Sequence, residues 1–447
     1  MAGLLRARPG LTRLAASLAV ALGMVSIVTC APAVAAAASG HTSVAAPLGG
    51  VNVGGLYEGA TPAMASREIA AAKALHAGVV RAGISWAVTE PAGAGQVSEG
   101  AQAFTDRLVS AAAADHIKVI LIVDSTPCWA SSAPAALARR CSPSRPSPAN
   151  AWPPRHPSDY AKFVAYLAKR YGAKLAAIEI WNEPDQANQL YFAGPHKAQR
   201  YAAILRAAYP AIKQADPAVP VIGGSLVGAN GIFLRALYAA GIKGYYDGLA
   251  VHFYTLGLAS LRAFREVQVA NGDTKPLWLD EFGWSSCYPR QKVQEEQPCV
   301  TPGIQARNLT DLIRSLPRAP YVAAQVMYKL QDSGQERFGV LSAAGRRKVA
   351  AGALAQALAS PFGRVHPIAL ALRRRGNSVV ASGSGPIGDY LQLEAFVGGV
   401  LRYRASFTLN RFDRYSLTLP AVLGTRGLQV RVYQPWAGLQ SAAQRSI

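Results

Sequence analysis

The sequence predicts an α/β protein: a (β/α)8 TIM barrel followed by a small C-terminal β-sandwich domain. From Gly49 to about Ser360, short apolar runs alternate with longer stretches rich in Ala, Leu and Arg at helical spacing. This pattern is typical of βα units around a parallel sheet. After Ser360 the sequence changes to alternating strands and turns, which is typical of a sandwich. We therefore assign residues 46–360 to the barrel and residues 361–447 to the sandwich.

The N-terminus has the three parts of a secretory signal. Three arginines precede an uncharged apolar stretch over residues 14–28, and the small-residue run APAVAAAASG follows. The pattern predicts a signal peptide over residues 1–35, cleaved after Ala35, and a secreted, extracellular protein. An uncleaved membrane anchor and lipid attachment at Cys30 are the alternatives. Pro32 and the alanines suit a cleavage region better than a membrane span, and Thr29 stands where a lipoprotein signal has Gly, Ala or Ser.

Eight apolar runs predict the strands of the barrel, in chain order. They are GGVNVGG near Val51, GVVRAGISW near Val80, IKVILIVDS near Ile120, LAAIEIW near Ile178, VPVIGGS near Val221, YDGLAVHFY near Ala250, KPLWLDEFG near Leu279 and AAQVMYKL near Val326. Between the fourth and fifth runs, residues 196–217 have an apolar stripe at helical spacing, which predicts an amphipathic helix. Eight such repeats over about 310 residues fit a (β/α)8 barrel with extended loops.

Two acids stand where predicted strands end. Glu183 follows the fourth strand, and Glu281 holds the same position on the seventh strand, 98 residues later. The functional groups of a parallel barrel gather at the C-terminal ends of its strands, so we expect both acids at one rim. Cleavage of a glycosidic bond needs such a pair, with one carboxyl to protonate the leaving oxygen and one to attack or to activate water.

Four marks in strand order resemble the clan A glycoside hydrolases, which are retaining (β/α)8 glycosidases, and are most similar to families 5 and 39. The marks are WNEP over residues 181–184, EFGW over residues 281–284, Arg81 closing strand two, and HFY over residues 252–254. They span about residues 49–335. The resemblance implies a glycosidase acting on the O-glycosidic bonds of a poly- or oligosaccharide by double displacement, with no metal and no cofactor.

The resemblance also implies roles for the residues at these marks. Glu183 would be the general acid/base and Glu281 the nucleophile. Asn182 would bond the sugar 2-hydroxyl. Arg81 would hold the nucleophile ionised and aimed, because a neighbouring cation favours the charged carboxylate. The remaining donors near the nucleophile would be His252 and Tyr254.

Other acids near the strand ends compete for these roles. We expect Glu179 to be a buried charge that pairs with a base inside the barrel. Asp280 abuts Glu281, and only the alternation of side chains along a strand separates them. The family usually has a small or hydroxyl residue at that position. Asp124, which ends strand three, and Glu90 could each contact substrate or cap a loop.

Several aromatic residues lie at or just beyond predicted strand ends, where flat rings could stack on sugar rings. Core packing is the alternative for each of them. The candidates are Trp86, Trp129, Trp181, Trp284 and Tyr328.

Four cysteines remain after the predicted signal, as two local pairs. An even count in an exported chain favours disulfides, and we expect Cys128–Cys141 and Cys287–Cys299 in the loops after strands three and seven. A zinc site is the weaker interpretation, because no C-x-x-C spacing is present.

The chain is strongly basic. Its formal net charge of +21 falls to +18 without the three arginines of the predicted signal. This charge favours attraction to polyanions, such as an acidic polysaccharide or an anionic cell envelope. Nucleic acid is a poorer partner, because the arginines lie in no recognisable nucleic-acid motif. A transglycosylase and a non-catalytic carbohydrate- or envelope-binding protein are the alternative functions. Oligomeric state, sugar and linkage are not predictable from the sequence.

Overall fold

The protein is described from a computed structural model of the 447-residue chain. The described residues are 46–56, 60–227, 230–254, 258–289, 299–334, 336–386, 391–424, 426–434, 439–440 and 444–445. The predicted signal peptide, residues 1–35, lies outside them. None of the helices within the described ranges combines the length and the hydrophobicity needed to cross a membrane.

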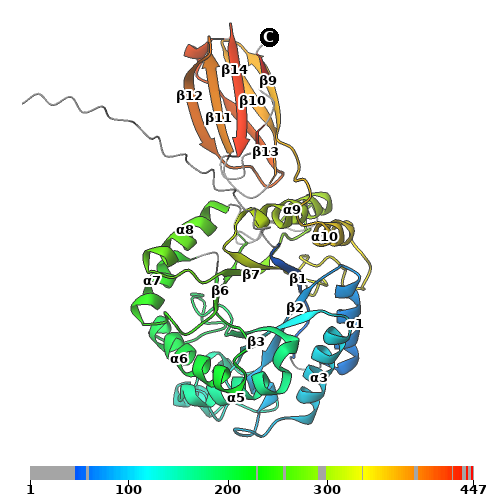
Figure 1. Ribbon diagram of the computed structural model, residues 1–447, viewed down its shortest axis with the longest axis vertical. Helices are drawn as coiled ribbons and strands as arrows, with labels where there is room; N and C mark the ends of the chain where they lie inside the picture. The colour runs from blue at the N-terminus through cyan, green and yellow to red at the C-terminus, as the bar shows by residue number, and fades with distance from the viewer. Residues whose placement is uncertain are drawn as a thin grey trace, which may run out of the picture. The chain divides into compact units, whose positions relative to one another are not determined.

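Eight parallel strands close into a barrel in the order β1 to β8, as the sequence predicted. Figure 1 shows the ring of strands surrounded by helices. Each strand overlaps one of the eight predicted apolar runs. The strands are β1 Leu48–Asn52, β2 Val79–Ser85, β3 Lys118–Asp124, β4 Leu175–Ile180, β5 Val221–Val227, β6 Gly248–His252, β7 Leu277–Phe282 and β8 Val322–Met327.

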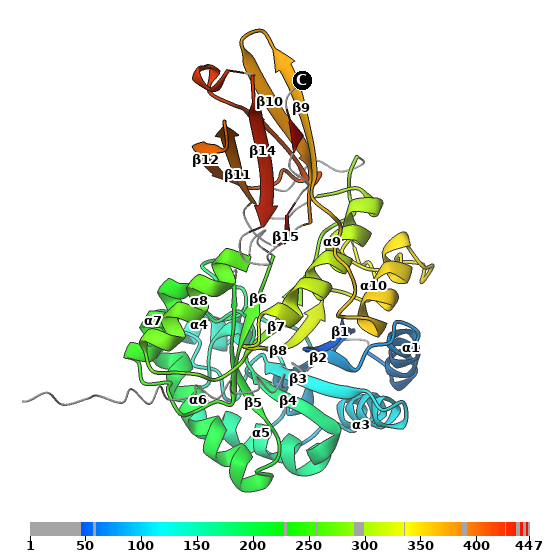
Figure 2. The ribbon, with the colours of Figure 1, turned by 45° about the horizontal axis from the view of Figure 1, so that its top comes forward.

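Helices form the outer layer of the barrel (Figure 2). The sequence supplies recognisable helix starts, as at α1, where the Thr61 side chain accepts the Met64 N–H and Pro62 opens the helix. The stripe predicted in α6 is buried from Tyr201 to Ile212. The helices are α1 Pro62–Lys73, α2 Trp86–Thr89, α3 Glu99–Ala114, α4 Ala135–Ala138, α5 Pro157–Tyr171, α6 Lys197–Ala215, α7 Gly231–Ala239, α8 Leu258–Ala270, α9 Pro302–Ser315 and α10 Val349–Ala359, with 3-10 turns η1 Pro148–Ala151, η2 Gly172–Lys174, η3 Leu316–Arg318 and η4 Ala421–Leu423.

Apolar side chains fill the interior of the barrel below the rim. Six buried residues from six different strands form one cluster there: Val79, Ile120, Ala177, Ile222, Ala250 and Val326. Side chains two residues apart on a strand share a face. Arg81 therefore lies above Val79, and Glu179 lies above Ala177. The polar groups of the rim therefore lie directly above this apolar layer.

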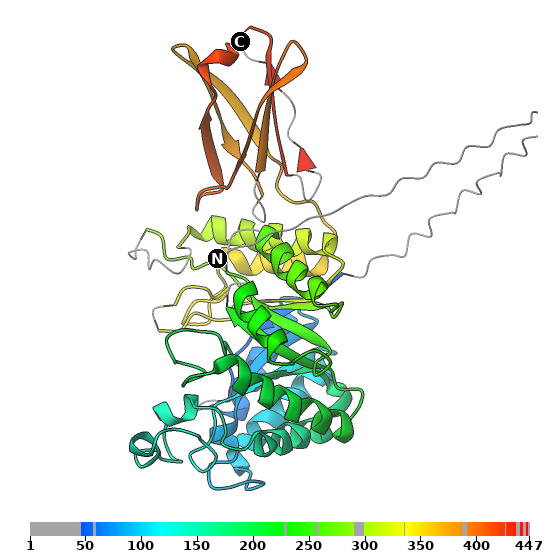
Figure 3. The same cartoon turned by 90° about the vertical axis from the view of Figure 1, so that its left-hand side faces the viewer.

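The C-terminal residues form two antiparallel sheets with a hydrophobic core of their own. One sheet has the order β13-β10-β9, and the other has the order β12-β11-β14-β15, with β16 also paired to β14. Figure 3 shows the two layers, which confirm the predicted sandwich. The strands are β9 Ala369–Arg375, β10 Ser378–Ser384, β11 Leu391–Val397, β12 Val400–Phe407, β13 Arg414–Thr418, β14 Leu428–Gln434, β15 Leu439–Gln440 and β16 Gln444–Arg445.

Candidate active site

One cavity at the C-terminal rim of the barrel brings the two predicted acids together. Its volume is about 510 Å³, and Glu183 and Glu281 both line it. The lining also takes in the ends of β1, β2, β3 and β8 with the loops that follow them. The residues are Asn52, Val53, Gly54, Gly55, Met64, Glu68, Arg81, Gly83, Ile122, Asp124, Asn182, Glu183, Tyr191, Glu281, Tyr328, Lys329, Leu330, Gln331, Asp332 and Ser333.

The backbone at this rim holds several non-glycine residues in left-handed conformations. Trp181 has φ 70° and Glu183 has φ 44°, just past the end of β4, and Ser225 in β5 has φ 54°. Such conformations are costly for residues with a Cβ and persist where surrounding structure enforces them. Here the Glu183 N–H donates to the Ser225 carbonyl at 3.2 Å. This bond fixes the turn that carries Glu183.

Arg81 lies at the centre of the acid cluster. Its Nη1 donates to Glu281 Oε1 at 2.6 Å, and its Nε and Nη2 donate to the two carboxylate oxygens of Glu179 at 2.8 and 2.7 Å. Burial acts to lower the pKa of Arg81, but Glu179 and Glu281 outweigh it and raise that pKa well above its usual value. The guanidinium is therefore a fixed positive charge beneath the cavity. The sequence-based expectation that Glu179 pairs with a base inside the barrel is confirmed.

Three donors surround Glu281. Arg81 contacts Oε1, and the Tyr254 hydroxyl donates to Oε2 at 2.7 Å. His252 Nδ1 lies 3.4 Å from Oε2. These contacts hold the Glu281 carboxylate in one orientation at the cavity.

Glu183 shares His252 with Glu281. His252 Nδ1 is 2.8 Å from Glu183 Oε1, so the histidine lies closer to Glu183 than to Glu281. Gln186 Nε2 donates to the other oxygen of Glu183 at 2.6 Å. Because Nδ1 contacts both acids, Glu183 Oε1 and Glu281 Oε2 cannot lie farther apart than the sum of the two distances, about 6.2 Å.

Asp280 does not point away from Glu281, as simple alternation along a strand would predict. Asp280 Oδ2 lies 3.4 Å from Arg81 and 2.8 Å from the Ser225 hydroxyl, so both neighbours enter the same cluster. The physical reason is the irregular pairing of β7, whose register with β8 shifts between Leu279 and Phe282. Asp280 is fully buried, whereas Glu281 lines the cavity.

Asn182 and the two remaining acids take different positions. Asn182 lines the cavity and accepts a hydrogen bond from Arg81 Nη2 at 3.1 Å through its Oδ1. Asp124 also lines the cavity. Glu90 instead caps a loop, because it accepts the Trp86 indole N–H at 2.9 Å and the Gly95 N–H at 3.0 Å.

Most of the aromatic candidates are packed rather than presented to the cavity. Trp86 and Trp181 have no exposed surface, and Trp284 is 2% exposed, so none offers a free face to a sugar. Trp86 packs edge-on against Trp129 and Tyr160, which is the core alternative. Trp129 is half-buried and lies outside the cavity lining, whereas Tyr328 lines the cavity. The stacking role predicted for the three buried tryptophans is therefore wrong.

Both predicted cysteine pairs are joined as disulfides. Cys128–Cys141 lies between β3 and α5, and Cys287–Cys299 lies between β7 and α9. No group of three His, Cys, Asp or Glu side chains within the described ranges is arranged to hold a metal ion.

Several residues of the site escaped the sequence analysis, among them Ser225, Lys329 and Tyr191. Ser225 bonds four cluster members, yet its only signal is its place at the end of the run VPVIGGS. Lys329 lies two residues past the end of β8, a position from which a rim residue could have been predicted. Tyr191 lies in a loop after the WNEP stretch, and no local pattern marks it.

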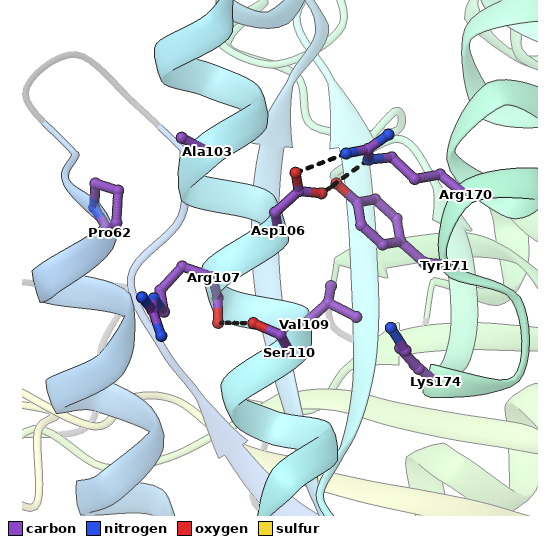
Figure 4. A pocket seen from close by; sticks show the side chains of 9 residues that line it. All are labelled: Pro62, Ala103, Asp106, Arg107, Val109, Ser110, Arg170, Tyr171 and Lys174. Carbon is purple, nitrogen blue, oxygen red and sulfur yellow. Dashed lines mark hydrogen bonds and ion pairs between the residues drawn. The ribbon is translucent and has the colours of Figure 1, made fainter.

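A second hollow, of about 610 Å³, lies on the helical layer and involves α1, α3 and α5 (Figure 4). Asp106 occupies its wall and is held by Arg170 at 2.8 and 2.6 Å and by Tyr171 at 3.0 Å. The carboxylate and the guanidinium therefore satisfy each other. This hollow contains neither of the predicted catalytic acids.

Sequence comparison finds no relative: no family profile matches the chain, and no curated protein does. Solved structures do match. A family 39 glycoside hydrolase from the gut symbiont Bacteroides cellulosilyticus WH2 shares 19% identity and a TM-score of 0.53, over 89% of this chain and 76% of that one.

Two further matches give a similar result. The family 39 enzyme from Xanthomonas axonopodis pv. citri shares 14% identity and a TM-score of 0.50, over 84% of this chain and 95% of that one. A family 30 endoxylanase from Clostridium papyrosolvens C71 shares 13% identity and a TM-score of 0.50, over 86% of this chain and 96% of that one. At these identities the likeness shows the fold, which is one that clan A glycoside hydrolases adopt.

Proposed function

We propose that the protein is a retaining glycosidase that hydrolyses O-glycosidic bonds of a poly- or oligosaccharide. The observation that carries the proposal is the meeting of Glu183 and Glu281 at His252 Nδ1, which limits their nearest oxygens to about 6.2 Å. Retaining enzymes hold their two carboxyl groups about 5 to 5.5 Å apart, and inverting enzymes hold them about 6.5 to 9.5 Å apart. The limit here applies to one oxygen of each acid and is compatible with the closer spacing of the retaining enzymes.

In the proposed reaction, Glu281 attacks the anomeric carbon and Glu183 protonates the departing oxygen. Arg81 and Tyr254 aim Glu281 through contacts of 2.6 and 2.7 Å. The resulting glycosyl-enzyme ester is then hydrolysed by a water that Glu183 deprotonates. Asn182, oriented by Arg81, is the candidate donor to the sugar 2-hydroxyl.

Replacement of each of the two acids should impair the reaction in a different way. Glu281→Gln removes the nucleophile and should abolish turnover of every substrate. Glu183→Gln removes proton transfer, a contribution of about 10² to 10⁴-fold, and should matter little for a leaving group that departs without protonation. On activated dinitrophenyl glycosides, this variant should give a burst of phenol and then stall. Azide should restart it and yield a glycosyl azide of retained configuration.

The measurements are stopped-flow release of phenol and NMR of the first-formed anomer. Glu99→Gln, an exposed acid at the start of α3, is the matched control and should behave as wild type. If Glu281→Gln instead gives the burst and a glycosyl azide of retained configuration, and Glu183→Gln is inactive on the activated glycosides, the two roles are exchanged. An inverted first product would rule out the retaining mechanism.

We also propose that the protein is exported. The support is the arginines, apolar stretch and small residues of the N-terminus, together with the two disulfides, which persist in oxidising compartments. Mass spectrometry of the protein recovered from culture medium should find Ala36 as the first residue. A protein that stays in the cytoplasm with residue 1 intact would contradict export.

A further inference from the structure

The cavity at the rim carries a charge opposite to that of the whole chain. Among the described residues that line it, carboxylates outnumber cations: Glu68, Asp124, Glu183, Glu281 and Asp332 against Arg81 and Lys329. The chain as a whole has a net charge of +21. The basic residues that give the chain its positive net charge are therefore not the ones that a bound sugar would meet.

Both cations of the lining are already neutralised. Arg81 is surrounded by Glu179 and Glu281, within 2.8 Å of each. Lys329 Nζ forms an ion pair with Glu336 and donates to the Ser333 hydroxyl at 2.5 Å. Neither cation is left to receive the carboxylate of an acidic sugar.

Asp124 is a buried carboxylate of the lining with a single hydrogen-bond donor. It ends β3 and is 7% exposed, and its Oδ1 accepts one hydrogen bond, from the adjacent Ser125 hydroxyl at 2.9 Å. No described residue donates a hydrogen bond to Oδ2. This oxygen is not one of the fully buried polar atoms that lack a partner, so it is accessible from the cavity and can accept a hydrogen bond from a molecule that binds there.

Asp124 is ionised at neutral pH. Burial raises its pKa to about 6, and the Ser125 hydroxyl and the charge of Arg81 limit the rise. An ionised, buried acceptor forms strong hydrogen bonds to hydroxyl and ammonium donors and repels a second carboxylate. Glu68, which lines the same cavity, adds to the repulsion of an anion.

We propose that the cavity binds a glycone without a carboxylate and that Asp124 selects it by accepting a hydrogen bond from a sugar hydroxyl or from the ammonium group of an amino sugar. This inference rests on the proposed glycosidase function and adds a substrate class to it. A uronic acid would bring a third acid to Asp124 and Glu68, with no free cation in the described lining to balance it. Neutral sugars and amino sugars meet no such obstacle.

The test compares 4-nitrophenyl glycosides of a neutral hexose, a pentose, a 2-amino-hexose and a hexuronic acid, in both anomeric forms, at pH 7.5. Wild-type protein should cleave a neutral or amino glycoside and leave the uronide intact. Asp124→Asn keeps the shape of the side chain and removes its charge. It should lower kcat/KM for the preferred glycoside by about 10 to 100-fold, the range for a hydrogen bond to a charged group.

The ratio between substrates separates selection from damage to the fold. In Asp124→Asn, the ratio of kcat/KM for the preferred glycoside to kcat/KM for the uronide should fall. If an amino sugar is preferred, the ratio of its kcat/KM to that of the neutral hexose should also fall. Asp115→Asn, at a partly buried acid that pairs with Lys73 outside the cavity, is the control and should change neither ratio. Equal losses on all substrates, or a wild-type preference for the uronide, would overturn the proposal.

A wild-type protein that cleaves no glycoside would contradict the proposed function, and binding then tests the inference separately. Glucose, xylose, glucosamine and glucuronate would be titrated calorimetrically into Glu281→Gln and into the double variant Glu281→Gln/Asp124→Asn. We expect the single variant to bind glucuronate more weakly than the other sugars. In the double variant, the affinity for glucuronate relative to the other sugars should increase. Tighter binding of glucuronate than of the other sugars, or binding of none of them, would overturn the inference.

Discussion

Ser225 shows how one unmarked residue connects the acid cluster. Its hydroxyl lies 2.6 Å from Glu179 Oε1 and 2.8 Å from Asp280 Oδ2. A hydroxyl has one proton to donate, so it cannot serve both carboxylates fully. Burial raises the pKa of Glu179 to about 7, with Asp280 adding to the rise and Arg81 opposing it. The two carboxyl groups therefore compete for one hydroxyl proton, and the charge of Asp280 makes ionisation of Glu179 less favourable.

Residue types and strand ends were enough to predict that Glu183 and Glu281 meet at one rim with Arg81, His252 and Tyr254. They did not predict the part that Ser225 plays among these residues. Glu183, Glu281 and Arg81 stand at positions where any parallel barrel displays its side chains, so their convergence follows from the fold. Whether Trp86 exposes a face depends on which loop covers it, and no local pattern encodes that. Lys329 and Tyr191 come from loops whose paths are set by tertiary packing.

Asp124 should make the stability of the protein depend on pH. Its pKa is raised from 3.8 to about 6 in the folded state, so its contribution is fully present below about pH 4 and is lost as the pH rises through 6. The loss corresponds to about 2 to 3 kcal/mol. The side chain of the Asp124→Asn variant cannot ionise, so the variant should not lose this stability as the pH rises. The difference in free energy of unfolding, variant minus wild type, should therefore grow by that amount between pH 4 and pH 8.

Urea titrations at a series of pH values measure this difference. Glu99→Gln, at the exposed acid that begins α3, is the comparison. A difference that stays constant across the pH range would mean that Asp124 is not held in a desolvated environment. The same titrations establish whether Asp124→Asn is folded under the conditions of the selectivity assay.

At the scale of elements, β5 and β7 build the site through departures from regular pairing. In β5, Gly224 has φ 107°, and a Cβ there would lie 2.8 Å from the Ala250 carbonyl oxygen, so the strand bends where only glycine fits. In β7, the shifted register turns Asp280 and Glu281 toward one arginine. The apolar runs predicted that both strands exist. The irregularities depend on pairing with neighbours far away in sequence, so the sequence did not predict them.

The loop between β3 and α5 depends on its disulfide. Cys128 and Cys141 are 13 residues apart, and in the entropy model a loop of this size stabilises the folded state by about 3 kcal/mol. Replacing both with Ala should therefore lower the free energy of unfolding by about that amount, measured by urea denaturation. Peptide mapping of the wild type should find Cys128–Cys141 and Cys287–Cys299. Free thiols, or pairing between the two loops, would contradict the assignment.

At the scale of the whole molecule, the attraction of a large polyanion and the recognition of a sugar are expected to depend on different features: the net charge of the chain and the side chains of the cavity. The alternation of apolar runs and helical stretches was enough to predict the barrel, and the loss of helical spacing after Ser360 was enough to predict the sandwich, because each pattern reports burial over many residues. The net charge likewise predicts attraction to polyanions. It does not predict the charge of the cavity, which depends on a few side chains brought together by the fold.

The basic surface should therefore act on large polyanions and not on the reaction at the cavity. Arg373, Arg374 and Arg375 are exposed at the end of β9, and replacing all three with Gln should weaken retention on immobilised polygalacturonate. Binding of the wild type should also fall steeply between about 0.01 M and 1 M salt, because the screening length shrinks from about 30 Å to about 3 Å. Cleavage of a small uncharged glycoside should change little over the same range, since it needs no long-range attraction. Salt-independent retention, or retention unchanged in the triple variant, would leave the basic surface without this role. A matching salt dependence of cleavage would instead mean that substrate capture at the cavity uses the surface charge, contrary to the separation argued here.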